Sequence, residues 1–315
     1  MKTTRNLIPL CLLCAALLPA VAQAQFTFTT NSGAITITGY NPGSGGDVTI
    51  PSMTNGWPVT SIGDGAFSSC YSLTSVTIPD SVTNIGSAAF YQCSGLTSVT
   101  IPNSVTSIGS DAFEFCSRLT SVTIPNSVTN IGSYAFLFCS GLTNLTIGTS
   151  VTSIGSSAFS RCSGLTSVTV PNSVTSIGNN AFHYCSGLKT VCFLGNAPGA
   201  GIDSTVFDGD NAATVYYLPG TTGWGLTFDG LPTALWFVPN PLILNNTPGF
   251  GVQTNQFGFT ISWATNISVV VEGCTNLVNP VWTPVTTNAL VNGTNYFSDS
   301  KWTNYPARFY RLRSP

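Results

Sequence analysis

The stretch SVTIPNSVTSIGSDAFEFC, from Ser98 to Cys116, decides the fold, because it returns almost unchanged as SVTIPNSVTNIGSYAFLFC from Ser121 to Cys139. The period is 23 residues, and five such units follow one another without gaps over residues 71–185. A half unit precedes this array at residues 59–70, and a degenerate half follows it at residues 186–193. Self-similarity at a fixed period of this length is typical of a solenoid, in which stacked units share one core.

Each unit carries apolar residues that it cannot bury alone. In the copy at residues 94–116, Val99 and Ile101 are two positions apart and therefore lie on one face of a short strand. Pro102 ends that strand, because proline cannot donate to a ladder. A second apolar pair follows, Val105 and Ile108, and then a glycine that allows a turn. Such units are stable only when neighbours cover their apolar faces.

The end of each unit is predicted to be a short turn of α- or 3₁₀-helix. In the segment SDAFEFC, the residues Ala112, Phe113 and Cys116 occupy positions i, i+1 and i+4, which places them on the inner side of such a turn. We therefore expect the cysteine of every unit to point into the shared core.

The repeated phrase L-T-S-V-T-I-P-x-S-V-T-x-I-G-x-x-A-F-x-x-C, together with the lead-in GAITITGYNPGSGGDVTIP at residues 33–51, resembles the BspA-type leucine-rich repeat proteins. The resemblance covers roughly residues 27–236. It implies a secreted or surface-displayed solenoid, often bacterial, that serves in adhesion or recognition. It implies no chemistry.

After Trp236 the period is lost, and short strand-like segments separated by turns predict a small β-sandwich. Its last phrase, FYRL at residues 309–312, resembles C-terminal modules of exported bacterial proteins, which anchor, sort or bind. The fold class we expect is a mainly β repeat solenoid of the leucine-rich-repeat type, with short strands and short helical or 3₁₀ turns, plus this sandwich. The predicted parts are a signal peptide (1–24), an N-terminal β cap (25–58), the solenoid (59–193), its C-terminal cap (194–237), a linker rich in Pro and Asn (238–249) and the β-sandwich (250–315).

The first 24 residues have the form of a secretory signal, with Lys2 and Arg5 before an apolar run and Ala-Gln-Ala at residues 22–24 as the cleavage site. The apolar run is too short for a membrane span, so we expect a secreted or cell-surface protein that does not span a membrane. The mature chain would hold seven basic and eleven acidic residues, a net charge near −4. Four of those basic residues fall in the last fifteen positions. A chain without a basic stripe along its body lacks the electrostatic footprint of nucleic-acid binding.

The recurring cysteines are interpreted as a column of buried, reduced thiols. Export makes disulfides possible, but equivalent residues of stacked units have parallel Cβ vectors, a poor geometry for a bridge. Metal binding is not expected because no C-x-x-C or Cys/His pair accompanies them, and we predict no cofactor. Cys192 and Cys274 lie outside the column, and Cys192 either pairs with Cys185 or stays free. The column consists of Cys70, Cys93, Cys116, Cys139, Cys162 and Cys185.

The two variable positions before each cysteine are the candidate ligand-binding site. They carry an aromatic side chain in several units, and stacking would align these side chains as an aromatic ridge along one edge of the solenoid. The alternative is that Phe115 and Phe138 fold inward and pack between coils. The candidate residues are Tyr91, Glu114, Phe115, Leu137, Phe138, Arg161, His183 and Tyr184.

Three other features of the sequence have both a functional and a simpler explanation. His183 is the only histidine; no nucleophile elbow accompanies it, which favours a solvated surface residue over catalysis. The turn DGDN at residues 208–211 has a weak similarity to a calcium loop but lacks the rest of an EF-hand pattern. The aligned Ser and Thr residues of the first strand form a regular hydroxyl array that suits a glycan or ice surface, or merely reflects solubility and β propensity.

Taken together, the sequence predicts a non-enzymatic protein that binds a protein or glycan through the solenoid surface. Two alternatives remain open at this stage. One is an exported hydrolase whose active site is not recognisable in the sequence. The other is a structural spacer that presents the C-terminal module.

Overall fold

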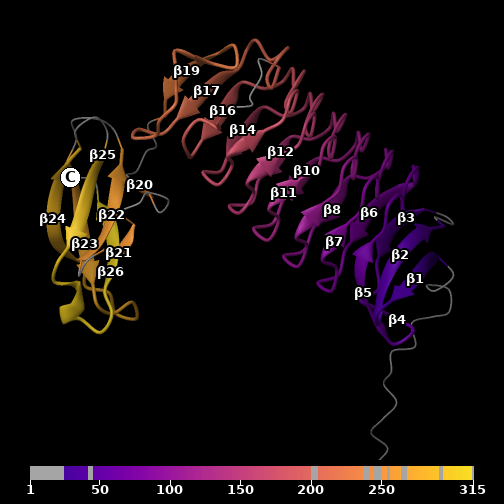
Figure 1. The fold of residues 1–315 in the computed structure, drawn as a ribbon, viewed down its shortest axis with the longest axis horizontal. Helices are drawn as coiled ribbons and strands as arrows, with labels where there is room; N and C mark the ends of the chain where they lie inside the picture. Colours follow the sequence, from indigo (N-terminus) through magenta and orange to yellow (C-terminus); the bar gives the residue numbers. More distant parts are fainter. Residues whose placement is uncertain are drawn as a thin grey trace, which may run out of the picture.

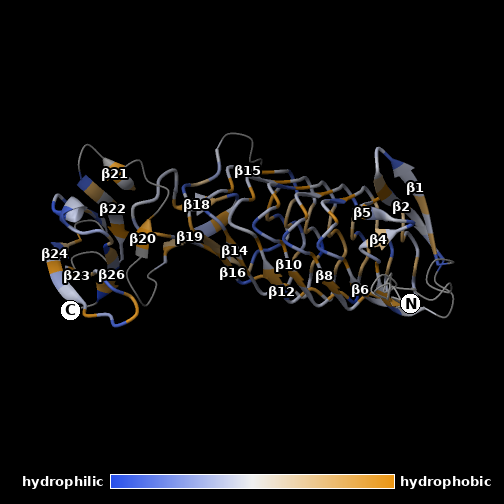
Figure 2. Ribbon diagram, turned by 90° about the horizontal axis from the view of Figure 1, so that it is seen from below, coloured by the Kyte–Doolittle hydropathy of each residue, from blue (hydrophilic) through white to orange (hydrophobic). Residues whose placement is uncertain are grey.

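The computed structural model describes residues 25–41, 45–199, 205–236, 242–244, 250–253, 256–263, 268–290 and 294–313. The predicted signal peptide therefore lies outside the described residues. The repeats form a stack of coils that runs in a gently curved row from an N-terminal sheet to a C-terminal pair of sheets (Figures 1 and 2). The fold is a mainly β solenoid followed by antiparallel β-sheets, as the repeat pattern predicts.

One side of the solenoid is a sheet built mostly from two-residue strands, one per coil. Equivalent isoleucines pair in parallel from coil to coil, for example Ile108 with Ile131 and Ile131 with Ile154. An N-terminal hairpin extends this sheet, and all its described strands are β1 (Phe26–Asn31), β2 (Ala34–Tyr40), β4 (Met53–Thr54), β5 (Trp57–Ile62), β7 (Asn84–Ile85), β9 (Ser107–Ile108), β11 (Asn130–Ile131), β13 (Ser153–Ile154) and β15 (Ser176–Ile177).

A second side is formed by the S-V-T strands, which continue into the C-terminal cap. The strands of the first part are β3 (Gly46–Thr49), β6 (Leu73–Thr77), β8 (Ser98–Thr100), β10 (Ser121–Thr123) and β12 (Asn144–Thr146). The strands of the second part are β14 (Ser167–Val170), β16 (Thr190–Phe193), β17 (Thr214–Tyr217), β18 (Thr227–Phe228) and β19 (Leu231–Leu235). The hairpin of β18 and β19 covers the last coil, as a solenoid cap must.

The third side consists of turns and not of the helical or 3₁₀ turns expected from the SDAFEFC segments. Asp111 and Phe115 have positive φ angles of 57° and 60°, outside the right-handed helical region. The backbone N–H of Phe113 donates to the Ala135 carbonyl of the next coil, at 2.7 Å, and that of Phe115 to Leu137, at 2.8 Å. The amides that a helix would use internally thus join successive coils.

The core is a set of columns, each built from one position of the repeat. The phenylalanine column holds seven rings whose neighbouring centroids lie between 4.8 Å and 5.5 Å apart. At the N-terminal end Tyr40 stacks on Phe67, with centroids 5.0 Å apart, and closes the column. Its members are Phe67, Phe90, Phe113, Phe136, Phe159, Phe182 and Phe207.

The C-terminal module has two antiparallel sheets around a separate core. One sheet holds β20 (Leu242–Leu244), β21 (Gly251–Gln253), β22 (Gln256–Ser262) and β25 (Thr294–Asp299); the other holds β23 (Ser268–Cys274), β24 (Thr283–Ala289) and β26 (Phe309–Arg313). A 3₁₀ turn, η1 (Trp302–Asn304), precedes β26. Phe259 and Phe297 from the first sheet and Val271 from the second share the core.

The segment predicted as a linker contributes a strand to this module. Leu242–Leu244 pairs antiparallel with Thr260–Ser262 of β22. The module also contacts the solenoid cap, because the Ser262 hydroxyl donates to the Pro219 carbonyl at 2.6 Å.

Candidate functional site

The variable pair before each cysteine lies on the turn side of the solenoid, and its second residue has an unusual backbone. This residue adopts a positive φ between 54° and 61° in six successive coils. Non-glycine residues rarely adopt this conformation, so the turn geometry takes precedence over local preference at this position. It presents the side chain at the edge while the following cysteine stays buried. The six residues are Ser69, Gln92, Phe115, Phe138, Arg161 and Tyr184.

Four of these side chains form one continuous stack, which we call the edge ladder: Phe115, Phe138, Arg161 and Tyr184. The rings of Phe115 and Phe138 stack with centroids 4.7 Å apart and an interplanar angle of 11°. The Arg161 guanidinium lies between the rings of Phe138 and Tyr184, 5.2 Å from the first centroid and 5.1 Å from the second. Along the ladder, two apolar rings are therefore followed by one cationic group and then by one phenol.

The edge ladder ends where the sequence places a glycine. Gly209 occupies the equivalent position of the next coil, with φ +85°, and a Cβ built there would lie 2.9 Å from Cδ1 of Tyr184. One face of the Tyr184 ring is thus covered by Arg161 and the other by the Gly209 backbone. Tyr184 is nonetheless 48% exposed.

The first residue of each pair supports the ladder from the side. Tyr91 contacts Phe115 edge to face, with centroids 5.9 Å apart. His183 contacts Tyr184 in the same way at 4.4 Å, and its Nε2 lies 3.5 Å from the Asp208 carboxylate. Phe115 and Phe138 are half-buried at the edge and stack on each other, so neither alternative weighed from the sequence describes them fully. All eight candidate residues come from this one edge. Glu114 and Leu137 are half-buried there.

Glu114 is the one candidate residue whose side-chain pKa is shifted. Burial, a hydrogen bond with the Asp111 side chain and the charge of that carboxylate together raise the pKa of Glu114 to about 7. Asp111 itself has a positive φ of 57°. The carboxyl groups of Glu114 and Asp111 therefore share a proton below neutral pH. The pair lies beside the aromatic end of the ladder.

Sequence reasoning missed two exposed tyrosines on this side of the solenoid. Tyr71 is 59% exposed and its hydroxyl donates to Oε1 of Gln92 at 3.2 Å. Tyr134 is 43% exposed. Each replaces a small or polar residue found at the same position of other units, and that departure from the repeat was the signal available.

The cysteine column lies directly behind the ladder, and its thiols are hydrogen-bonded and buried. Each of its members from Cys93 onward donates its S–H to the carbonyl of a phenylalanine in the preceding coil, at Sγ to O distances of 3.0–3.3 Å. All eight described cysteines are free and buried. Burial raises the pKa of Cys93 and of Cys162 to about 12, so these thiols are not nucleophiles at neutral pH.

Among the described residues, no group of three or more His, Cys, Asp or Glu side chains has the arrangement that a metal ion requires. In the turn compared with a calcium loop, Asp208 is exposed and Asp210 is buried. The two carboxylates of this turn therefore face different surroundings.

The hydroxyl array predicted on the S-V-T strands is present as two columns, exposed except at the half-buried Ser75. Serines pair in register from Ser75 to Ser98 and from Ser98 to Ser121, and Asn144 interrupts the series. The matching threonine column runs beside it, through Thr77, Thr100, Thr123, Thr146 and Thr169.

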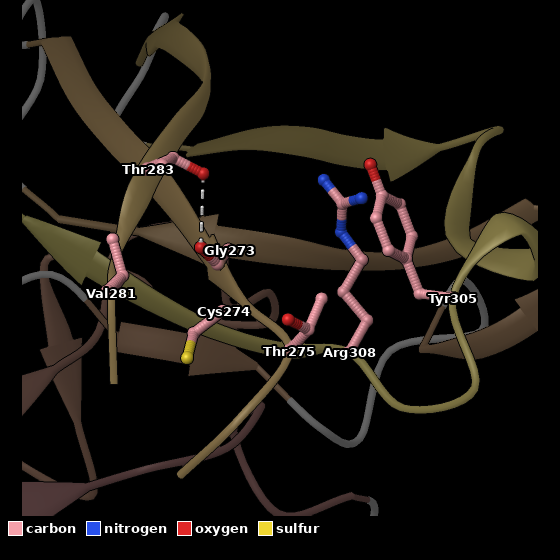
Figure 3. A pocket seen from close by; sticks show the side chains of 7 residues that line it. All are labelled: Gly273, Cys274, Thr275, Val281, Thr283, Tyr305 and Arg308. Carbon is pink, nitrogen blue, oxygen red and sulfur yellow. Dashed lines mark hydrogen bonds between the residues drawn. The ribbon is translucent and has the colours of Figure 1, made fainter. Parts of the chain in front are cut away.

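The C-terminal module contains a cavity of about 240 Å³ (Figure 3). Figure 3 shows Arg308 and Tyr305 side by side at this cavity, together with Cys274. The guanidinium of Arg308 lies 4.2 Å from the Tyr305 ring centroid, and its Nε lies 3.0 Å from Asp299. None of the candidate residues of the solenoid edge lines this cavity.

The described part of the chain contains no helix with the length and apolar character that crossing a membrane requires. No curated protein matches the chain.

Comparison with known families matches residues 60–189 to the BspA type leucine rich repeat region, in six copies. Among solved structures, a leucine-rich cell surface protein from Faecalibacterium prausnitzii is 32% identical, with 61% of this chain and 69% of that chain covered and a TM-score of 0.44. The leucine-rich repeat protein TpLRR of T. pallidum is 29% identical, with 61% and 78% covered and a TM-score of 0.44. The pneumococcal vaccine antigen PcpA is 22% identical, with 62% and 63% covered and a TM-score of 0.48. The repeats of this chain match the family model, and the F. prausnitzii relative is 32% identical with 69% of its length covered, so the chain belongs to the BspA-type leucine-rich repeat family.

Proposed function

We propose that this protein is a secreted or cell-surface, non-catalytic binding protein that recognises a protein partner through the edge ladder. The observation that carries the proposal is the continuous stack of Phe115, Phe138, Arg161 and Tyr184 along one solenoid edge. Aromatic residues and arginine dominate the binding energy of protein interfaces. The F. prausnitzii relative, described as a cell surface protein, supports the proposed location.

The geometry of the ladder favours a protein over a glycan. Sugars pack on the open faces of aromatic rings, whereas the faces of Phe138 are occupied by Phe115 on one side and Arg161 on the other. What the ladder presents outward is ring edges, one guanidinium and the Tyr184 hydroxyl. Such a mixed apolar and hydrogen-bonding line suits side chains and backbone of a protein surface.

The solenoid frame supports recognition by holding these groups rigidly. Backbone hydrogen bonds of 2.7–3.0 Å join neighbouring coils at and directly behind the ladder. Side chains that are already ordered lose less conformational entropy on binding, which favours affinity.

The test compares two arrays probed with the mature chain, one of extracellular proteins and one of glycans. We expect protein hits that weaken about tenfold or more in the double variant Phe138→Ser and Tyr184→Ser. A matched control, Thr100→Ala and Thr123→Ala on the hydroxyl face, should bind like the wild type. Binding that survives the ladder substitutions, or that occurs only on glycans, contradicts the proposal.

A repeat deletion separates recognition from the spacer alternative. Removing residues 94–139 takes out two whole units and with them the Phe115–Phe138 stack. Loss of binding is the expected result. A spacer would retain any binding by the C-terminal module and only become shorter.

A further inference from the structure

The last coil departs from the 23-residue repeat, yet its turn follows the same plan. The N–H of Phe182 donates to the Val206 carbonyl at 2.9 Å, as the N–H of Phe159 donates to Ala181 at 2.7 Å one coil earlier. The ring of Phe207 continues the phenylalanine column, 5.5 Å from Phe182. Val206 and Phe207 therefore stand where the earlier coils have Ala-Phe.

This register places Asp210 in the cysteine column. The N–H of Asp210 donates to the Phe207 carbonyl at 3.0 Å, just as that of Cys185 donates to Phe182 at 3.2 Å. The Asp210 carbonyl accepts from Ala213 at 2.8 Å, as that of Cys185 accepts from Leu188 at 2.7 Å. An acidic residue thus occupies the position that six coils give to a thiol.

The surroundings of Asp210 are those of a buried thiol and not of a carboxylate. The residue is 2% exposed, and within the described residues its carboxyl oxygens have no well-formed hydrogen bond, although the Cys185 backbone approaches closely enough to lower the pKa of the group. An ionised carboxylate buried without partners is strongly unfavourable. A protonated carboxyl, in contrast, carries one O–H donor.

An acceptor is available at the equivalent place. The carbonyl of Phe159 accepts two bonds, from the N–H of Cys162 at 3.3 Å and from the thiol of Cys185 at 3.1 Å. The carbonyl of Phe182 accepts the first of these, from the N–H of Cys185 at 3.2 Å. By the repeat geometry its second bond would come from the residue that follows Cys185 in the column.

We propose that Asp210 folds as the neutral carboxylic acid and donates its O–H to the Phe182 carbonyl, closing the thiol column with an acid. The structure makes the C-terminal end of the solenoid a proton-dependent element. Burial, assisted by the charge of Asp208, raises the pKa of Asp210 to about 7, against the opposing effect of the Cys185 backbone.

The other titratable groups near this turn have contacts of their own. Cys185 is a buried thiol whose pKa is raised well above its usual value. Asp208 is exposed and lies 3.5 Å from His183. The Asp229 carboxylate accepts the N–H of Phe207 at 2.7 Å from the β18–β19 turn, and the Tyr184 ring rests on Gly209.

The direction of the pH effect follows from proton uptake on folding. In the unfolded chain an aspartate titrates near pH 4, whereas here the folded protein keeps its proton up to about pH 7. Between these values the folded state binds one proton more than the unfolded state, so stability falls as pH rises and levels off above the folded pKa. The unfolding equilibrium constant is expected to rise about tenfold per pH unit in this window.

The test uses the mature chain with Glu114→Gln, because Glu114 also has a raised pKa and would add the same dependence. Unfolding by urea is measured at several pH values between 5 and 8, together with hydrogen exchange of residues 205–236 corrected for intrinsic rates. We expect both stability and protection of this segment to fall across the window. Asp210→Asn, which keeps a donor without a titration, should abolish the slope, and Asp210→Cys, the residue of the other coils, should do the same.

The control is Asp80→Asn, which removes an exposed aspartate and should leave the slope unchanged. A slope that persists in both Asp210 variants overturns the proposal. So does protection of residues 205–236 that is independent of pH in the parent protein. If Asp210→Asn fails to fold, the Asp210→Cys variant still decides the question.

Discussion

The thiol of Cys116 donates a hydrogen bond to the carbonyl oxygen of Phe90 in the preceding coil, with Sγ and O 3.2 Å apart. The contact recurs with the same offset along the column. A side chain that is small, apolar and able to donate weakly fits this position, since it fills the core and also serves a carbonyl. The repeated cysteine is therefore explained by packing and hydrogen bonding.

Replacing a central thiol tests this explanation. Cys139→Ala removes the bond to the Phe113 carbonyl and leaves a small void, so we expect a loss of about 1–3 kcal/mol in the free energy of unfolding. Cys139→Ser keeps a donor and should lose less. Urea unfolding of the three proteins measures both differences. An alanine variant as stable as the wild type would remove the structural role.

Thiol labelling tests the state of the column. The described cysteines are free and buried, and burial raises the pKa of Cys93 to about 12. We therefore expect native protein at pH 8 to react slowly with a maleimide or an aromatic disulfide reagent, and denatured protein to react at every thiol. Cys70 and Cys192, at 5% and 8% exposure, should react first in peptide mapping. Bridged cysteine peptides in the non-reduced protein would contradict the reduced column.

The sequence allowed the inward positions to be predicted because they repeat. Phe113 and Cys116 recur in every unit, and a residue that each copy retains at a fixed place is one the shared core requires. The turn conformation was not predictable in the same way. A positive φ at Phe115 contradicts local propensity; the residue is held by a hydrogen bond and a ring contact to the next coil, which a single unit does not reveal.

The features that break the period were the hardest to predict. Asp210 lies 25 positions after Cys185, so its place in the column appears only through the hydrogen-bond register. Leu242–Leu244 lies in a segment whose Pro and Asn content predicts a linker, yet it pairs with β22 through long-range contacts. At the ladder, aromatic composition predicted the edge, while the insertion of Arg161 between two rings required the geometry.

The glycine that follows each two-residue strand of the repeats packs against the backbone of the neighbouring coil, so a side chain there should be sterically unfavourable. A Cβ at Gly132 would lie 2.5 Å from the Gly109 carbonyl carbon and 2.6 Å from the Ser110 nitrogen, both backbone atoms that cannot move aside locally. We expect Gly132→Ala to lower the unfolding free energy by more than about 2 kcal/mol, because adjacent coils must separate. Ser110→Ala, one residue beyond the glycine of the previous coil, is the matched control. Similar urea midpoints for the two variants would show that the coils are not held this closely.

The Glu114 carboxyl gives the solenoid edge its own pH dependence. Burial, a hydrogen bond with Asp111 and that residue's charge raise the pKa of Glu114 to about 7, whereas an unfolded glutamate titrates near 4.3. The folded state therefore holds an extra proton between these values, and stability decreases as pH rises through the window. Glu114→Gln should flatten this part of the profile in urea unfolding. Asp111→Asn should lower the Glu114 pKa and shift the window to lower pH, and an unchanged profile in both variants would contradict the coupling.

The guanidinium of Arg161 links the aromatic halves of the edge ladder, so its removal should affect both stability and recognition. Each exposed cation–π contact contributes about 0.5–1 kcal/mol, and Arg161 makes two, with Phe138 and Tyr184. We expect Arg161→Met to lower the free energy of unfolding by about 1–2 kcal/mol. Arg161→Lys should lower it less, because lysine keeps the charge but not the planar stacking. Urea unfolding measures the stability, and near-ultraviolet circular dichroism reports the Tyr184 environment. If binding of a partner found on the protein array falls in Arg161→Met by far more than stability does, the ladder acts in recognition. Equal, small losses in both would indicate that Arg161 only supports the fold.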